Sequence, residues 1–111
     1  MNESILVSIK KMLGIDENYD AFDVDIIAHI NAALMIARQI GVGKDIRISG
    51  ERERWCDFIE DERYLNGIQS YIYEKVKMAF DPPSSSVAVD ASKSFASELE
   101  WRLNLISEGS E

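Results

Sequence analysis

The only two prolines of the chain stand side by side in the segment FDPPSSSV, residues 80–87. Proline lacks the backbone N–H and clashes with the preceding helical turn, so a helix cannot continue through Pro82 and Pro83. The residue before a proline is also pushed out of helical geometry, which restricts Asp81. The serines that follow can cap a new helix with their hydroxyls. The sequence therefore predicts a rigid structural corner at Asp81, Pro82 and Pro83, between two helices.

Apolar residues recur every three or four positions over most of the remaining chain, which is the spacing of one helical face. The pattern predicts helices over residues 3–13, 20–40, 52–60, 62–80 and 86–106. Asn2 and Asp20 are expected to cap the first two helices, and Gly14 and Gly41 to end them. The predicted fold class is all-α, a small bundle of four to five helices in which two long helices form a hairpin at the corner.

Each predicted helix carries an apolar stripe that should pack into a common core. In the first two helices the stripe consists of Ile5, Leu6, Ile9, Met12, Leu13, Phe22, Ile26, Ile27, Ile30, Ala33, Leu34, Ala37 and Ile40. In the later helices it consists of Trp55, Phe58, Ile59, Leu65, Ile68, Ile72, Val76, Ala79, Phe80, Val87, Ala91, Phe95, Leu99, Leu103 and Ile106. Such a core suits one domain, expected to span residues 1–106 and to be followed by a flexible acidic tail at 107–111.

Residues 44–50 do not follow the helical pattern. Ile46 and Ile48 alternate with polar residues, as they would in a β-strand, but the chain has no second strand pattern. We therefore expect an extended connector in this segment, able to pair with a neighbouring subunit.

The charge balance restricts the class of partner. The chain has 111 residues and a net charge of −8, from 20 acidic and 12 basic residues. Such a surface repels phosphates and anionic lipids, so neither nucleic acid nor membrane is expected as the main partner. The single cysteine, Cys56, excludes an internal disulfide, and no Cys/His cluster suits zinc. The first residues contain no long apolar run, so we expect no signal peptide or membrane span, and a reducing, soluble compartment.

Three carboxylates, Asp57, Glu60 and Asp61, have the spacing of magnesium ligands on one helix face. No second acidic pair stands at a matching distance in the sequence, so we interpret them as a solvated surface. His29 has no evident acid or nucleophile partner and is interpreted as a structural histidine. The sequence thus predicts no catalytic residue, no cofactor and no metal site.

Three further features have interpretations of their own. Cys56, next to Trp55, is expected to be a small core residue rather than a reactive thiol. Gly41 and Gly43 lack the lysine and hydroxyl of a phosphate-binding loop, so we interpret them as helix-stop residues. Trp101 lies off the apolar stripe of the last helix, which leaves both an interface and a core position open.

Six segments occur in a recognisable order along nearly the whole chain. They are MLGI (12–15), FDVDIIAHIN (22–31), QIGVG (39–43), WCDF (55–58), YIYEKVKMAFDPPSS (71–85) and EWRLN (100–104). Together they resemble the head–tail connector (adaptor) family of tailed bacteriophages, whose members sit below the portal of the capsid. Arg38 and Tyr73 depart from the pattern, since aliphatic residues are expected at both positions.

The resemblance implies a helical structural protein of the virion, made in the bacterial cytoplasm and located at the head–tail junction. It implies a ring that matches the symmetry of the portal, with the portal on one face and the next head-completion or tail protein on the other. DNA would pass through the ring only as cargo, and no membrane would be involved. Trp101, Leu105 and Ile106, which extend an apolar strip beyond what the bundle needs, are then expected to contact a neighbouring subunit or the portal.

Two other classes of function stay open on the sequence alone. One is a small acidic helical regulator, encoded by a phage or prophage, that binds another protein as a monomer or dimer. The other is a metal-dependent hydrolase that uses Asp57, Glu60 and Asp61.

Overall fold

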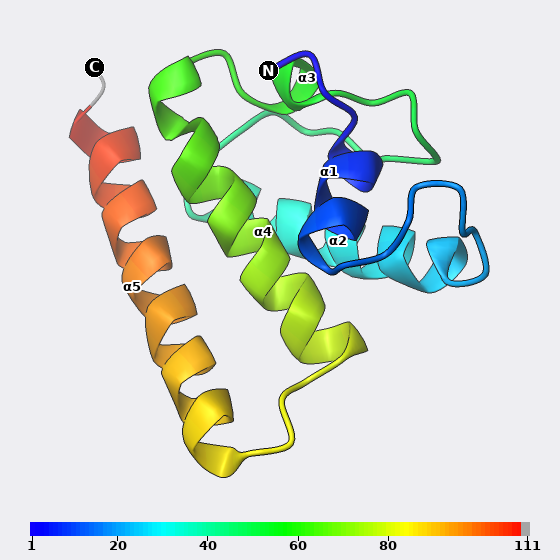
Figure 1. The fold of residues 1–111 in the computed structure, drawn as a ribbon. Helices are drawn as coiled ribbons and strands as arrows, with labels where there is room; N and C mark the ends of the chain where they lie inside the picture. Colours follow the sequence, from blue (N-terminus) through cyan, green and yellow to red (C-terminus); the bar gives the residue numbers. More distant parts are fainter. Residues whose placement is uncertain (110–111) are drawn as a thin grey trace.

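The computed structural model describes residues 1–109 and consists of helices joined by loops (Figure 1). The elements are α1 (Ile5–Met12), α2 (Asp23–Gln39), α3 (Trp55–Phe58), the 3-10 turn η1 (Glu62–Tyr64), α4 (Leu65–Phe80) and α5 (Ser86–Gly109). Within this range, the only pairing of extended backbone is an isolated bridge between Ser4 and Arg54, so the predicted all-α class is confirmed. None of the helices in residues 1–109 has the length and apolar character needed to cross a bilayer.

The central element is α4, which packs against α2 on one side and α5 on the other, while α1 contacts both α2 and α4 (Figure 1). The core consists of Ile5, Leu6, Ile9, Ile26, Ile30, Ala33, Leu34, Ala37, Val42, Ile48, Trp55, Phe58, Ile59, Ile68, Tyr71, Ile72, Val76 and Leu103. Most of these were predicted from helical spacing. Val42 and Ile48 come from the connector between α2 and α3, which lies extended against the core as expected.

The start of α2 differs from the prediction because a buried lysine fixes it. Lys10 is fully buried, and its Nζ donates to the Glu17 carbonyl at 3.0 Å and lies 2.9 Å from Asp23 Oδ1. This contact ties the loop after α1 to the first residue of α2, which begins three residues later than predicted. Asp20 is therefore not a cap, and the N-cap position of α2, held by Phe22, makes no side-chain hydrogen bond.

Other helix ends are also shifted. Ser4, and not Asn2, caps α1, because its Oγ accepts from the Val7 backbone N–H at 3.3 Å. The helix predicted over 52–60 shortens to the four residues of α3. At the other end of the chain, α5 continues to Gly109, beyond the predicted end at Ile106. The expected flexible tail therefore begins inside a helix, and its last two residues lie outside the described part of the chain.

Several residues predicted to be buried are exposed instead. They are Met12, Phe22, Ala79, Val87, Ala91, Phe95 and Ile106. The largest error concerns α5, whose packed face runs through Val89, Ser92, Ala96, Leu99 and Leu103. Both faces of α5 carry small or apolar residues at helical spacing, so apolar periodicity alone does not select one of them.

Polar contacts with α4 select the packed face of α5. The hydroxyl of Tyr71, which is fully buried, donates to Glu100 Oε1 at 2.9 Å. Six residues after the start of α5, the Ser92 hydroxyl donates to Glu74. Burial of the ring, together with the hydrogen bond and charge of Glu100, raises the pKa of Tyr71 well above its ordinary value.

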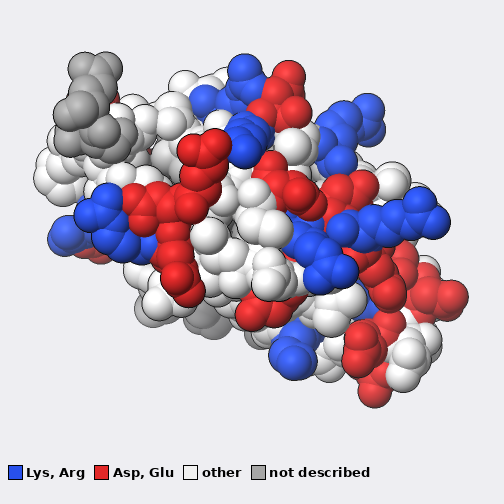
Figure 2. Space-filling view, turned by 90° about the horizontal axis from the view of Figure 1, so that it is seen from above, with Lys and Arg blue, Asp and Glu red and all other residues white. Residues whose placement is uncertain are grey.

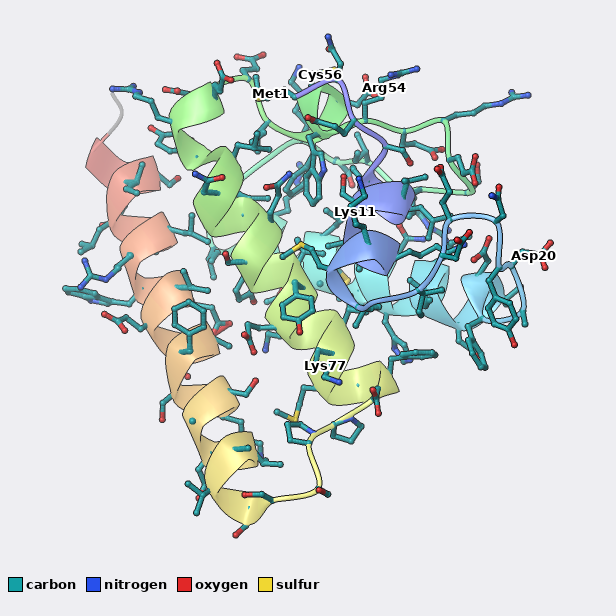
Figure 3. The ribbon with its side chains drawn as sticks, in the orientation of Figure 1. Met1, Lys11, Asp20, Arg54, Cys56 and Lys77 are labelled. Carbon is teal, nitrogen blue, oxygen red and sulfur yellow. The ribbon has the colours of Figure 1, made fainter. Side chains whose placement is uncertain are left out.

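The corner lies where the prolines predict it. α4 ends at Phe80, and Lys77 Nζ in its last turn donates to Asp81 Oδ2 at 2.8 Å (Figure 3). On the other side, the Ser85 hydroxyl accepts from the Ala88 backbone N–H at 3.2 Å and caps α5. The expected serine cap is therefore present.

Gly43 gives a test of the packing around α3. Its φ is +85°, and a Cβ there would overlap the ring of Phe58, which is fully buried. We expect Gly43→Ala to lower the free energy of unfolding by more than the ~1–2 kcal/mol that a left-handed conformation alone costs. Gly14→Ala, with φ +81° but open space, should show only that smaller cost, and Gly50→Ala almost none. Urea unfolding measures all three, and equal losses for Gly43→Ala and Gly14→Ala would contradict the Phe58 contact.

Tyr71 predicts an alkaline sensitivity. Its pKa is raised in the folded state, so above about pH 10 an unfolded tyrosine loses its proton while folded Tyr71 keeps it. The unfolded state then binds fewer protons, and stability falls as pH rises from that point. We expect Tyr71→Phe to lose less stability than the wild-type protein between about pH 9 and 11, measured by urea unfolding. Tyr19→Phe controls for loss of a hydroxyl from an exposed ring, and parallel pH profiles for wild type and Tyr71→Phe would refute the assignment.

Candidate interaction surface

The three predicted interface residues all lie exposed near the end of α5, but they do not form one patch. Trp101 is 61% exposed and Leu105 is 45% exposed. Four residues separate them, so they share one helical face, directed away from α4. Ile106 is 41% exposed and lies on a different side of the helix. Of the two positions left open for Trp101, the structure excludes the core, because its ring lies on the surface.

Hydrogen bonds to the end of α2 fix this part of α5. Asn104 Nδ2 donates to the Ile40 carbonyl at 2.8 Å, and the Ser107 hydroxyl donates to the Gly41 carbonyl at 2.6 Å. These carbonyls lie at the C-terminal end of α2, where they have no partner within that helix. The exposed face with Trp101 and Leu105 is therefore held on a rigid support.

A cavity of about 420 Å³ lies beside Ile106. Leu103, Ile106 and Ser107 line it from α5, and residues 41–44, residues 58–61 and Tyr64 line the rest. An ion pair between Lys44 Nζ and Glu60 Oε1, 3.2 Å apart, stands among these lining residues. The cavity therefore combines an apolar wall from α5 with a charged wall from the loops.

The three carboxylates considered as metal ligands are directed to different partners. Asp57 Oδ2 accepts from the backbone N–H at the N-cap of α3 at 2.9 Å, and Glu60 pairs with Lys44. Asp61 pairs with Arg63, and hydrogen bonds from the side chain and backbone N–H of Arg63 lower the pKa of Asp61. Within residues 1–109, no group of three His, Cys, Asp or Glu side chains is placed to hold a metal ion.

Four other residues considered in the sequence analysis occupy structural positions: His29, Cys56, Gly41 and Gly43. His29 lies half-buried on α2. Cys56 was expected to be a core residue, but it lies half-buried at the edge of the fold because α3 turns it toward the N-terminal segment. Its Sγ lies 3.8 Å from Asn2 Oδ1, near Met1 (Figure 3). Gly41 and Gly43 both have positive φ, in agreement with a helix stop after α2.

One polar residue that carries much of this architecture, Asn31, was missed in the sequence. Asn31, inside α2, donates to the Ile48 carbonyl at 3.0 Å and accepts from the Ile48 backbone N–H at 2.8 Å. This double hydrogen bond imitates a neighbouring strand and holds the extended connector against α2. A half-buried asparagine in the middle of an apolar helix is the sequence signal for such a contact, because its amide needs partners.

Charges of both signs are interspersed over the face seen in Figure 2, which views the molecule from above. Several acidic and basic residues pair at this surface and elsewhere, among them Arg38 with Asp45 and Arg102 with Glu98. Glu98 and Arg102 stand four positions apart along α5, a spacing that favours such a pair. The net charge of −8 is opposite in sign to the basic surface typical of nucleic-acid binding.

The arrangement is that of a rigid helical body with exposed apolar side chains and acidic charge, which suits contacts with other proteins. A model of the phage connector protein family matches residues 5–110, a span that includes α1 to α5. No curated protein and no solved structure matches the chain. Because the family match covers nearly all of its length, the chain belongs to the phage connector protein family.

Proposed function

We propose that the protein forms a ring at the head–tail junction of a phage particle, between the portal and the next head-completion or tail protein. The observation that carries the proposal is the family match over residues 5–110, which spans every helix of the fold. The role is structural, and DNA passes through the ring without being gripped. A net charge of −8 supports this, since a conduit for DNA benefits from weak attraction to phosphates.

A ring of identical subunits needs two different contact surfaces on each subunit. We assign one of them to the exposed end of α5, where Trp101 and Leu105 face away from α4. Aromatic side chains are enriched in the centres of protein interfaces, because they bury a large area with few rotatable bonds. Ile106 and the adjacent cavity lie on a different side of α5, next to the loops at residues 41–44 and 58–61.

The corner supports the ring through the shape of the subunit. Asp81, Pro82 and Pro83 separate two long helices, and the Lys77–Asp81 ion pair and the Ser85 cap hold the two helix ends on either side. The angle between α4 and α5 is then fixed by the backbone. In a closed ring this angle contributes to the wedge shape of each subunit, and so to the number of subunits that close the ring.

The α5 surface is tested by truncating its side chains. We expect Trp101→Ala with Leu105→Ala to weaken assembly on the purified portal at least about tenfold, as for an interface hot spot, while circular dichroism stays unchanged because both side chains are exposed. Electron microscopy and light scattering of protein mixed with portal provide the measurement. Tyr19→Ala with Met12→Ala is the matched control, since it truncates an exposed aromatic and an exposed apolar residue far from α5 in sequence. Rings that form equally well with the α5 variant would exclude this surface, and a wild-type protein that never assembles on portal would refute the proposed function.

The corner is tested by removing both prolines. We expect Pro82→Ala with Pro83→Ala to let α4 extend past Phe80, because the backbone N–H groups and helical geometry are restored. The core residues are unchanged, so the subunit should still fold, with more helix by circular dichroism. Assembly on the portal should be reduced. Unchanged ring formation by this variant would show that the corner does not set the shape of the ring.

A further inference from the structure

α2 buries one side against α4 and α1 and leaves another side open to solvent. Val24 is 82% exposed, the highest value among the large apolar side chains of residues 1–109, and Met35 is 57% exposed. Eleven residues, or three turns, separate them, so they lie on the same side of the helix about 16 Å apart. Ala28 and Ala32, both exposed, lie between them. We call these four residues the open α2 face.

The C-terminal half of this face borders a cavity of about 600 Å³. The cavity lies between α2 and residues 44–47, and its apolar lining consists of Ala32, Leu34, Met35 and half-buried Ile46. Arg38 and Arg47 stand at the same cavity. The double hydrogen bond between Asn31 and Ile48 holds the connector in place, so the cavity is part of the rigid fold.

The two ends of the open α2 face carry opposite charges. Asp20 and Asp25 flank its N-terminal end along the chain and Glu17 lies in the preceding loop, and within the described part of the chain none of these three carboxylates forms an ion pair. Figure 3 shows Asp20 on the loop at the outer end of the molecule. At the C-terminal end, Arg47 likewise has no acidic partner among residues 1–109, and Arg38 shares only a 3.6 Å contact with Asp45.

We propose that the open α2 face is a contact between two copies of this chain, packed antiparallel about a two-fold axis near Ala28 and Ala32. Antiparallel packing places the acidic end of each copy against the basic end of the other, and Val24 against Met35. A two-fold contact satisfies both ends at once, because each surface is its own complement. The alanines at the centre allow the two helix axes to approach to about 8–10 Å.

The dimer differs from the ring in symmetry and strength. A two-fold contact closes after two copies, whereas a ring requires heterologous contacts. A contact confined to one helix face is smaller than the ~1,200–2,000 Å² of a standard stable interface, so the dimer is weak and reversible. The dimer is a state of the free protein that does not use the α5 surface, and it dissociates into monomers at low concentration.

Sedimentation velocity of the full chain, from about 10 µM to about 1 mM, tests the dimer over the range expected for a weak interface. We expect a monomer–dimer equilibrium whose dissociation constant rises about tenfold in Val24→Ser, as for an interface anchor. Val87→Ser is the matched control, because Val87 is 77% exposed on α5.

The charge contribution is tested by Arg47→Glu, which should also weaken the dimer about tenfold, with Lys93→Glu on α5 as control. Combining Arg47→Glu with Asp20→Lys should restore the dimer, since the opposite charges are then exchanged.

Circular dichroism verifies that each variant is folded, which their exposed positions favour. Absence of any association at about 1 mM, or a dimer unaffected by both Val24→Ser and Arg47→Glu, overturns the proposal. A monomeric protein in which Val24→Ser reduces portal binding overturns it as well, and assigns the face to another protein. In each of these cases, rings of wild-type protein on the portal would leave the proposed function standing.

Discussion

The fold depends on the burial of α4 on two opposite sides. Ile68, Ile72 and Val76 are fully buried, and each buried side chain of this size contributes about 1.5–3 kcal/mol. α2 packs on one side of this helix and α5 on the other, while α1 packs against both α2 and α4. Since α5 has few other contacts within the described chain, its position follows from α4. The Tyr71–Glu100 hydrogen bond then selects which side of α5 is turned inward, because a buried hydroxyl without a partner is costly.

Sequence periodicity predicted the helical class, the order of the helices and the corner, because repeated apolar spacing and paired prolines act locally. It failed where a polar side chain is satisfied by a distant part of the chain. Lys10 is charged, so a search for apolar residues passes over it, yet it is fully buried and sets the beginning of α2. Similarly, the stripe through Val87 and Phe95 has the correct spacing, but the partners of Tyr71 and Glu74 lie on the neighbouring face of α5. No local pattern encodes such pairings.

The candidate interaction surface was likewise predicted from the sequence only in part. The prediction of Trp101 and Leu105 as interface residues rested on an apolar strip that extends beyond what the bundle needs, and both side chains are exposed. Whether they bind another subunit is a question of assembly. Asn104 and Ser107, which hold that end of α5 on the last carbonyls of α2, have no signal in spacing. The open side of α2 was also missed, because Val24 and Met35 look like ordinary members of an apolar helix until the buried side is known.

The short connection at the prolines also has a consequence for folding during synthesis. α1 and α2 emerge from the ribosome long before α4, the helix that covers much of their apolar surface. Until about residue 80 is available, the nascent chain therefore exposes apolar surface that invites binding by a chaperone. α5 then needs to close only the loop of residues 81–85, whose entropic cost is small. The last helix can consequently dock soon after its release from the ribosome.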